Sequence, residues 1–265
     1  MSTEGDLIEI VGLSSAYGDF HALDNVRFGI PKNQITVIMG VSGCGKTTLL
    51  RHLVGLKRTP PGQILVEGED LGKFNESKLH AYRRKIGVLF QSGALFNSLS
   101  VQENIAVPLK VHTELAGETI RIMALMKLKL VGLSGFCDYM PSQLSGGMRK
   151  RAGLARALAM DPEILFVDEP SSGLDPITAA DLDRMILELR ETLGMTIVVV
   201  THELESAFKI ASRVVVMDKG KVMAMGSPEE VLKSSDERVR QFLGRKADKH
   251  QVNLESYYAC LMATD

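Results

Sequence analysis

The sequence predicts an α/β fold built on a parallel β-sheet that is covered by helices. Three short, largely apolar runs of strand length, residues 35–39, 164–167 and 195–200, alternate with segments of helical periodicity. The runs do not alternate apolar with polar residues, which is typical of strands covered on both faces. Each run leads into glycine or polar residues, and open α/β sheets bind ligands at the carboxyl ends of their strands. We therefore expect a ligand site along one edge of this sheet.

Composition limits the classes of function. The 265 residues, 45% of them hydrophobic, are enough for one large domain or for one domain with a lobe. The 31 Lys and Arg residues nearly balance the 32 Asp and Glu residues, so the chain lacks a global basic field, and we expect no nucleic-acid partner. Three widely spaced cysteines fit neither a disulfide framework nor a zinc site, which favours a reducing compartment.

The longest apolar stretches do not predict a membrane span. Residues 164–167 and 196–200 are far shorter than the ~20 residues that a transmembrane helix needs. Glu4 and Asp6 stand where a signal peptide would carry basic residues. We therefore expect the chain to stay in the cytoplasm.

Helix-capping residues predict where several helices begin and end. Asp175 followed by Pro176 predicts a helix start, and Gly194 predicts the end of that helix. Ser227 with Glu230 forms a capping box that predicts a further helix near the C-terminus.

A helical subdomain is predicted inside the α/β domain. Ser100 and Glu103 form a capping box that opens a mostly helical stretch to about residue 141, and we expect a subdomain over about residues 92–158. Residues before Pro31, together with residues 62–67, are expected to form a small β layer. The domain then covers residues 1–243, and residues 244–265 form a tail that is either disordered or docked on a partner.

A glycine-rich loop follows the first predicted strand. Its Gly-x4-Gly-Lys-Thr spacing lets backbone N–H groups turn around a phosphate, because glycine tolerates positive φ angles. Lys46 would add charge at the β/γ oxygens, and Thr47 would offer a hydroxyl to Mg²⁺ at the start of a helix whose dipole faces the phosphates. A turn that merely opens a helix is the alternative. The predicted nucleotide-binding residues here are Gly40, Val41, Ser42, Gly43, Cys44, Gly45, Lys46, Thr47 and Thr48.

Cys44 lies inside this loop, where backbone N–H groups and a helix N-terminus favour anions. We therefore expect its thiolate to be unusually accessible. Alkylation of the Cys44 thiol would then inhibit the activity of the protein, and bound MgATP would protect the thiol from alkylation.

Two acidic residues follow the apolar run at 164–167. Asp168 would hold Mg²⁺ through water, as in other P-loop NTPases, and Glu169 would polarise the attacking water. A general base is worth about 10²–10⁴ in rate, so loss of Glu169 should stop turnover and spare binding. The alternative is that both acids only cap the following turn.

Three further residues acquire candidate roles from this set. Gln91 could reach both Mg²⁺ and the attacking water, although an isolated glutamine would be read as a surface residue. His202, after the run at 195–200, could hydrogen-bond the γ-phosphate, although an isolated histidine there would be structural. Tyr17 could stack on adenine without reading base edges, so that nucleotide selectivity would be weak.

The chain resembles the ATP-binding cassette (ABC) family from residue 8 to about residue 243. The glycine loop, Gln91, the Leu-Ser-Gly-Gly segment, the two acids, Leu174-Asp175 and His202 occur in that family's order. The resemblance implies a RecA-like P-loop NTPase core with a small antiparallel β layer and an inserted helical subdomain. It also implies a head-to-tail dimer, in which one subunit contacts the γ-phosphate held by the other through Ser145, Gly146 and Gly147.

Met148 narrows the resemblance, because the family usually has glutamine after the two glycines. Leu-Ser-Gly-Gly-Met, with residues 89–96 and Pro108-Leu109, resembles the Mla (maintenance of lipid asymmetry) ATPases. These energise phospholipid transport between the two membranes of diderm bacteria. Residues 171–175 are closer to the general cassette pattern.

The resemblance implies a set of partners at the cytoplasmic face of the bacterial inner membrane. They are a second copy of the chain, an integral membrane permease, a periplasmic MCE lipid-binding protein and a small STAS-domain protein. A short helix after Gln91 and the region from Leu95 to Pro108 would form the groove for the permease. The remaining alternatives are a solvated loop for the groove, an importer of small polar solutes for the transporter, and a soluble cofactor-assembly ATPase.

Overall fold

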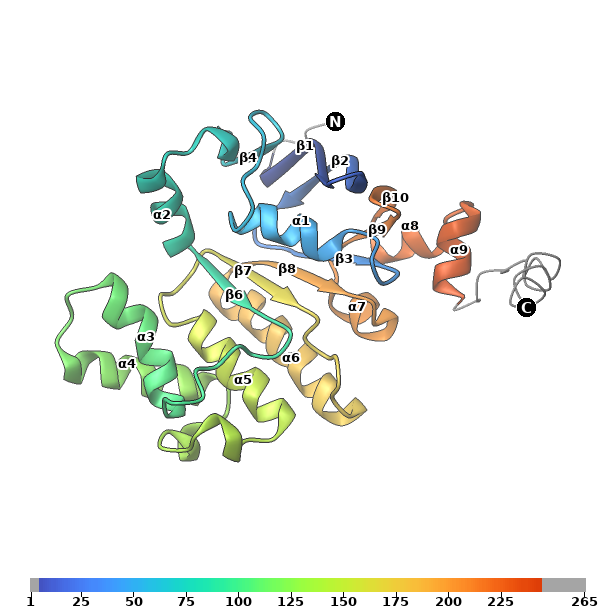
Figure 1. Cartoon of the computed structure of the whole chain (residues 1–265). Helices are drawn as coiled ribbons and strands as arrows, with labels where there is room; N and C mark the ends of the chain where they lie inside the picture. The colour runs from blue at the N-terminus through green and yellow to red at the C-terminus, as the bar shows by residue number, and fades with distance from the viewer. Residues whose placement is uncertain (1–4, 245–265) are drawn as a thin grey trace, which may run out of the picture.

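The predicted parallel sheet is confirmed by the computed structural model, which describes residues 5–244 (Figure 1). The large sheet has the strand order β10-β9-β3-β8-β7-β6. Neighbouring strands in it run parallel, except β10 with β9. Its strands are β3 (Ile35–Gly40), β6 (Ile86–Leu89), β7 (Ile164–Asp168), β8 (Thr196–Thr201), β9 (Arg213–Asp218) and β10 (Lys221–Gly226).

The two faces of this sheet belong to two hydrophobic cores. Successive side chains of a strand point to opposite faces, so Val37 packs in one core and Ile38 in the other, both fully buried. The first core includes residues of α5 (Gly146–Ala157) and α6 (Pro176–Leu193). The second core includes α1 (Lys46–Leu53), which lies between the large sheet and a smaller one (Figure 1). Burial on both faces explains why the strands are apolar along their length.

The predicted small antiparallel layer is also confirmed. Its four strands have the order β2-β1-β4-β5, and each neighbouring pair is antiparallel. The strands are β1 (Asp6–Tyr17), β2 (Phe20–Pro31), β4 (Ile64–Val66) and β5 (Glu69–Asp70). The turn between β1 and β2 places Tyr17 at the end of its strand.

Helices pack at one end of the large sheet, next to β6 (Figure 1). Helix α3 contacts both α4 and α5, and α4 contacts α5. Asn104 on α3 is buried and bonds the backbone of Phe96 through both its amide oxygen and its amide nitrogen, at 2.7 and 3.1 Å, which ties the preceding loop to the helix. The elements here are α3 (Val101–His112), α4 (Gly117–Leu130) and the 3₁₀ turns Ser134–Phe136 and Pro141–Gln143.

The prediction of a short helix after Gln91 is wrong. Residues 91–100 form turns and extended chain, and the next helix begins at Val101. Gly93 and Ala94 both have left-handed backbones, with φ of 75° and 48°, and such angles cannot continue a right-handed helix. Arg156 on α5 holds this turn by donating to the carbonyl oxygens of Gly93 and Ala94 at 3.1 and 2.7 Å.

The helix caps predicted at Asp175, Gly194, Ser100 and Ser227 are all confirmed. The Asp175 carboxylate accepts from the backbone N–H groups of Ile177 and Thr178, and Gly194 ends α6 in the left-handed conformation. Ser100 and Ser227 each form a capping box with the glutamate three residues later. These caps satisfy N–H groups that the first helical turn leaves without intrahelical partners.

The remaining helices complete the described part of the chain. None of the helices in residues 5–244 is long and apolar enough to cross a membrane. Most of the tail predicted at 244–265 lies outside the described residues. The remaining helices are α2 (Glu76–Arg84), α7 (Leu204–Ile210), α8 (Pro228–Leu232), α9 (Glu237–Leu243) and the 3₁₀ turn Leu71–Lys73.

Candidate functional site

The glycine loop joins the carboxyl end of β3 to the first turn of α1. Gly40 and Gly45 are required there by close packing as well as by φ. A Cβ on Gly45, whose φ is 106°, would lie 2.4 Å from the carbonyl oxygen of Ala22, and a Cβ on Gly40 would lie 2.1 Å from that of Met217. The loop thus has backbone N–H groups and the positive end of the α1 dipole at its mouth, an arrangement that binds anions.

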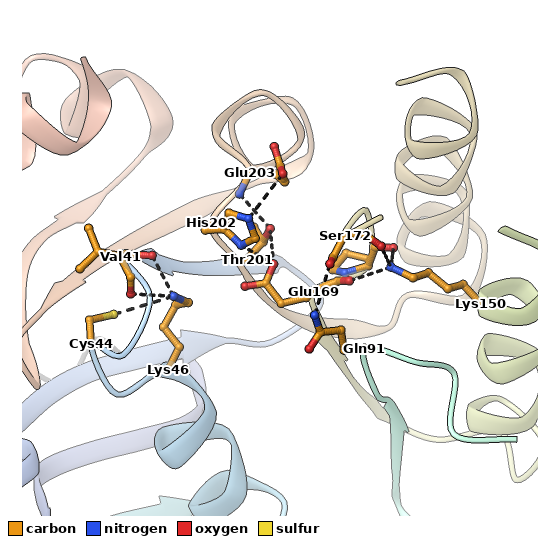
Figure 2. Close-up of polar contacts among 12 residues, drawn as sticks. Val41, Cys44, Lys46, Gln91, Lys150, Glu169, Ser172, Thr201, His202 and Glu203 are labelled. Carbon is orange, nitrogen blue, oxygen red and sulfur yellow. Dashed lines mark hydrogen bonds and ion pairs between the residues drawn. The ribbon is translucent and has the colours of Figure 1, made fainter. Parts of the chain in front are cut away.

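Lys46 folds back over the loop. It is 7% exposed, and its ammonium donates to the carbonyl oxygens of Gly40 at 2.8 Å and Val41 at 3.1 Å (Figure 2). These two carbonyls satisfy a charge that is otherwise costly to bury. A phosphate group entering the loop would find this ammonium already at the rim of the loop.

The expectation that the Cys44 thiolate is unusually accessible is wrong. Its side chain is 2% exposed, and burial raises the pKa of its thiol despite the nearby ammonium of Lys46. The sulfur points inward, since a Cβ on Gly40 would lie 2.7 Å from it. A loop that presents backbone N–H groups to a ligand therefore turns this side chain toward the core.

Alkylation of Cys44 should consequently be slow in the folded protein. Thiolate is the reactive form, and both burial and the raised pKa reduce it. Mass spectrometry after iodoacetamide treatment at pH 8 should show Cys44 labelled at least about tenfold more slowly in native than in denatured protein. Equal labelling rates in the two states would contradict the buried position.

Both acids lie at the carboxyl end of β7, next to β8. The Glu169 carboxylate lies 2.9 Å from Nδ1 of His202 and accepts from the hydroxyl of Thr201 at 3.3 Å (Figure 2). The Glu169 side chain is 13% exposed, so these partners fix its direction. Burial, followed by the charge of Glu169, raises the pKa of Asp168. Two adjacent carboxylates are thus held together in a site that is partly shielded from solvent.

A cavity of about 620 Å³ brings most of the predicted residues together. Three of its lining residues, Leu204, Gln241 and Phe242, were not found from the sequence. Gln241 and Phe242 lie on α9, which has no motif that would have indicated them. The predicted residues that line the cavity are Val41, Ser42, Gly43, Lys46, Thr47, Gln91, Asp168, Glu169 and His202.

The oxygen donors around this cavity fit Mg²⁺. Thr47 offers a hydroxyl, Asp168 a carboxylate and Gln91 an amide oxygen, and all three line the same space. Mg²⁺ prefers oxygen ligands and is usually held by one or two carboxylates together with substrate phosphates. A cation here would also favour the ionised form of Asp168, whose pKa is raised by burial and, next, by the charge of Glu169.

Tyr17 does not line this cavity but lies beside the loop at the end of β1. Its ring is 47% exposed, and the ammonium of Lys57 lies 3.6 Å from its centroid. Hydrogen bonding by Thr48, followed by that of Lys57, lowers the pKa of the Tyr17 hydroxyl. The ring therefore has a cation over one face and is placed within reach of the glycine loop.

A buried network holds Lys57. Its ammonium donates to the Ser15 hydroxyl at 2.8 Å, and that oxygen lies 3.1 Å from Nε2 of His52. Burial lowers the pKa of His52 to about 4, so the imidazole is neutral at pH 7. Nδ1 of His52 lies 3.3 Å from the Thr59 hydroxyl, so the imidazole bridges two hydroxyl groups, one of which, that of Ser15, accepts from Lys57.

Ser145, Gly146 and Gly147 are not brought to the nucleotide cavity of the same chain. They begin α5, where the Ser145 hydroxyl accepts from the N–H of Met148 at 3.2 Å. Gly146 lines a separate groove of about 450 Å³ that also includes Leu95, Asn97 and Leu174. Gln91 lines both spaces, so it stands between the nucleotide cavity and this groove.

The fold and this cavity define a P-loop ATPase of the cassette type, and comparison with known proteins agrees. A family model described as "ABC transporter" matches residues 23–172. The chain belongs to the ABC transporter family, as its ATP-hydrolysing cassette.

Particular relatives cover nearly the whole chain. It is 43% identical to the intermembrane phospholipid transport system ATP-binding protein MlaF of Haemophilus influenzae, over 92% of each chain. It is 42% identical to MlaF of Escherichia coli K12, over 92% of this chain and 90% of that one. A probable ribonucleotide transport ATP-binding protein of Mycobacterium leprae is also 42% identical, over 91% of this chain and 70% of its own length.

Solved cassettes share the fold. A dimeric ATP-binding cassette in a post-hydrolysis state, bound to ADP and Pi, is 31% identical with a TM-score of 0.76, and the match covers 83% of this chain and 98% of that one. A cassette of Clostridium perfringens that is part of an ABC transporter complex is 28% identical with a TM-score of 0.79, over 97% and 99% of the two chains.

Proposed function

We propose that this protein is the ATP-hydrolysing subunit of a transporter that moves phospholipids between the inner and outer bacterial membranes. The observation that carries the proposal is the 42–43% identity to MlaF proteins over 92% of the chain. The Met148 that follows the Leu-Ser-Gly-Gly segment supports the same branch of the family. In this role the chain converts ATP and water to ADP and phosphate and drives movements of a membrane permease.

The chemistry is assigned to residues of the cavity. Backbone N–H groups of residues 40–48 and the ammonium of Lys46 bind the phosphates and hold them in place. Thr47, Gln91 and Asp168 would hold Mg²⁺, which would supply positive charge to offset that of the phosphates. Glu169 accepts a proton from the attacking water, and its carboxylate is aimed by His202 at 2.9 Å. His202, whose side chain is about half exposed, has its other ring nitrogen, Nε2, 3.6 Å from the Glu203 carboxylate, and we assign this nitrogen to the hydrogen bond with the γ-phosphate.

The active form is a head-to-tail dimer of two copies of the chain. Ser145, Gly146 and Gly147 lie outside their own nucleotide cavity, and an exposed helix N-terminus with an N-cap hydroxyl is suited to a phosphate carried by another chain. ATP binding closes the dimer because closure adds these contacts. Hydrolysis removes them and lets the dimer open.

The groove beside Gln91 is proposed as the docking place of the permease. It is lined by residues of the turn at 91–97, of α5 and of the segment 172–174, and Phe96, next in sequence to the lining residue Leu95, is 51% exposed. Gln91 lines both the groove and the nucleotide cavity. Loss of the γ-phosphate on hydrolysis is therefore transmitted to the bound permease through Gln91. The further partners are a periplasmic MCE protein and a STAS-domain protein, and the complex lies on the cytoplasmic face of the inner membrane.

Purification of the complex from its host membranes tests the lipid assignment. We expect a permease to co-purify with the chain, and mass spectrometry of the extracted complex to identify bound phospholipid. A complex that binds nucleosides, amino acids or other small polar solutes and no phospholipid would replace the proposal with an importer. A chain that stays soluble while its permease is abundant would favour a cofactor-assembly ATPase.

Lys57→Met tests the proposed adenine contact. The substitution removes the ammonium from the Tyr17 ring and its bond to Ser15, while it keeps the aliphatic stem. We expect ATP to bind about 2- to 5-fold more weakly with kcat unchanged, because a cation–π contact at an exposed site is worth about 0.5–1 kcal/mol. Steady-state KM and direct titration with a fluorescent ATP analogue measure the change. Unaltered affinity would remove Lys57 and Tyr17 from the adenine site.

A further inference from the structure

Lys150 is a buried lysine whose ammonium hydrogen-bonds the backbone of the segment 169–172, which begins with the second of the two acids. It lies on the second turn of α5 and is 6% exposed. Its ammonium donates to the carbonyl oxygens of Glu169 at 3.0 Å, Pro170 at 2.6 Å and Ser172 at 2.6 Å (Figure 2). An ammonium has three N–H donors, and here three carbonyl oxygens accept them.

Such a position is costly for a charged side chain. Burial lowers the pKa of Lys150, because the charged form loses its hydration. A buried ammonium persists only where surrounding acceptors replace water, and here the acceptors are three carbonyl oxygens of the short segment 169–172. The arrangement therefore fastens one short turn to α5.

The turn that Lys150 holds has a strained backbone. Glu169 has a φ of 48°, in the left-handed region that residues other than glycine seldom adopt. Such a conformation persists when the surroundings determine it, and strain of this kind concentrates at functional sites. The N–H of Glu169 donates to the carbonyl oxygen of Val200 at 2.8 Å, and the carbonyl oxygen of Glu169 accepts from Lys150, so both backbone polar groups of this residue have partners.

The same turn is also tied to the residue between the two cavities. Nε2 of Gln91 donates to the Ser172 hydroxyl at 3.3 Å, while Lys150 binds the carbonyl of Ser172. Figure 2 shows Lys150 and Gln91 approaching this turn from different elements, with the Glu169 carboxylate pointing toward His202. The direction of that carboxylate thus depends on a backbone that α5 holds in place.

We propose that Lys150 is a positioning residue for hydrolysis, whose ammonium holds the 169–172 turn against α5 so that the Glu169 carboxylate stays aimed at the phosphate cavity. The proposal rests on the role of Glu169 proposed above. Lys150 itself does not line the nucleotide cavity, and it lines the groove beside Gln91 instead. Because α5 begins at Ser145, the helix that meets the partner's nucleotide in the closed dimer is the same helix that holds Glu169 for its own nucleotide.

The first experiment compares Lys150→Met and Lys150→Arg in the assembled transporter. Lys150→Met keeps the length of the side chain and removes all three donors, so we expect kcat to fall about 10- to 100-fold with KM for ATP within about twofold of wild type. Lys150→Arg restores donors and charge and should recover most of the loss. Lys129→Met, the same change at an exposed position of α4, is the matched control and should leave both constants unchanged.

ATP binding and thermal unfolding are measured on the same preparations, so that a variant that does not fold is recognised. If Lys150→Met does not fold, Lys150→Gln, which keeps an amide donor, takes its place. A wild-type kcat in Lys150→Met would overturn the proposal, and so would a wild-type kcat in Lys150→Gln, whose amide supplies at most two of the three donors. So would a loss confined to KM, because Lys150 would then act on nucleotide binding.

The second experiment asks whether Lys150 acts through Glu169. Single-turnover hydrolysis is compared in Glu169→Gln and in the double variant Lys150→Met with Glu169→Gln. If Lys150 only positions Glu169, the second substitution should change the residual rate less than about twofold, because coupled residues are not additive. Multiplied losses would show that Lys150 acts elsewhere. Normal turnover of Glu169→Gln alone would instead contradict the role of Glu169, which separates the two failures.

Discussion

Replacing Glu169 with glutamine is expected to reduce ATP turnover by about 10²–10⁴ while leaving ATP binding intact. Glutamine keeps the shape of the side chain and its contacts with Thr201 and His202, but it cannot accept a proton from the attacking water. The variant should therefore bind ATP, close and remain closed. Phosphate release measures turnover, and light scattering with and without MgATP measures the trapped dimer.

A surface carboxylate serves as the control. Glu188→Gln on α6 makes the same chemical change at a side chain that is 66% exposed, and it should hydrolyse ATP at the wild-type rate. Turnover by Glu169→Gln within about threefold of wild type would remove Glu169 from the role of general base.

Ser145→Arg is expected to abolish hydrolysis without weakening ATP binding to the isolated chain. Ser145 begins α5 and does not line the nucleotide cavity of its own chain, so nucleotide affinity should be preserved. In the closed dimer the long arginine would occupy the space proposed for the partner's γ-phosphate. Equilibrium titration with an ATP analogue, dimerisation by light scattering and phosphate release measure the three properties separately.

Ser77→Arg provides the matched control, because Ser77 is an exposed serine on α2 and does not line the phosphate cavity. It should bind, dimerise and hydrolyse as the wild type does. Hydrolysis by Ser145→Arg at the wild-type rate would contradict the proposed dimer contact, and weakened ATP binding in the monomer would place Ser145 in its own nucleotide site.

Much of the fold could be predicted from local chemistry. Strands buried on both faces are apolar along their length, and the caps at Asp175, Ser100 and Ser227 depend on side chains within three residues of the helix start. The turn after Gln91 was mistaken for a helix because the left-handed Ala94 is imposed by distant contacts. Arg156, 62 residues away, holds its carbonyl.

The candidate site was predictable where a motif spacing brings its residues together, as for Lys46 and the acids of β7. Residues whose bonding partners are far away in the sequence have no such motif. Lys150 and Lys57 reach their partners from 19 and 42 residues away, and the sequence near each resembles an ordinary charged helix or loop. Cys44 was misjudged for a related reason. Backbone N–H groups that face a ligand direct the adjacent side chain into the core, where its exposed fraction is 2%.

The central claim is that each ATP is hydrolysed between two copies of the chain, and mixed dimers isolated through two different tags test it most directly. One dimer pairs a Lys46→Ala chain with a Ser145→Ala chain, and the other pairs a chain carrying both substitutions with a wild-type chain. In a head-to-tail dimer only the first arrangement keeps one composite site in which Lys46 and Ser145 are both intact. We therefore expect ATP turnover per dimer to be several-fold higher in the first arrangement. Higher turnover in the second, which contains a complete wild-type chain, would show that one chain suffices and would contradict the account.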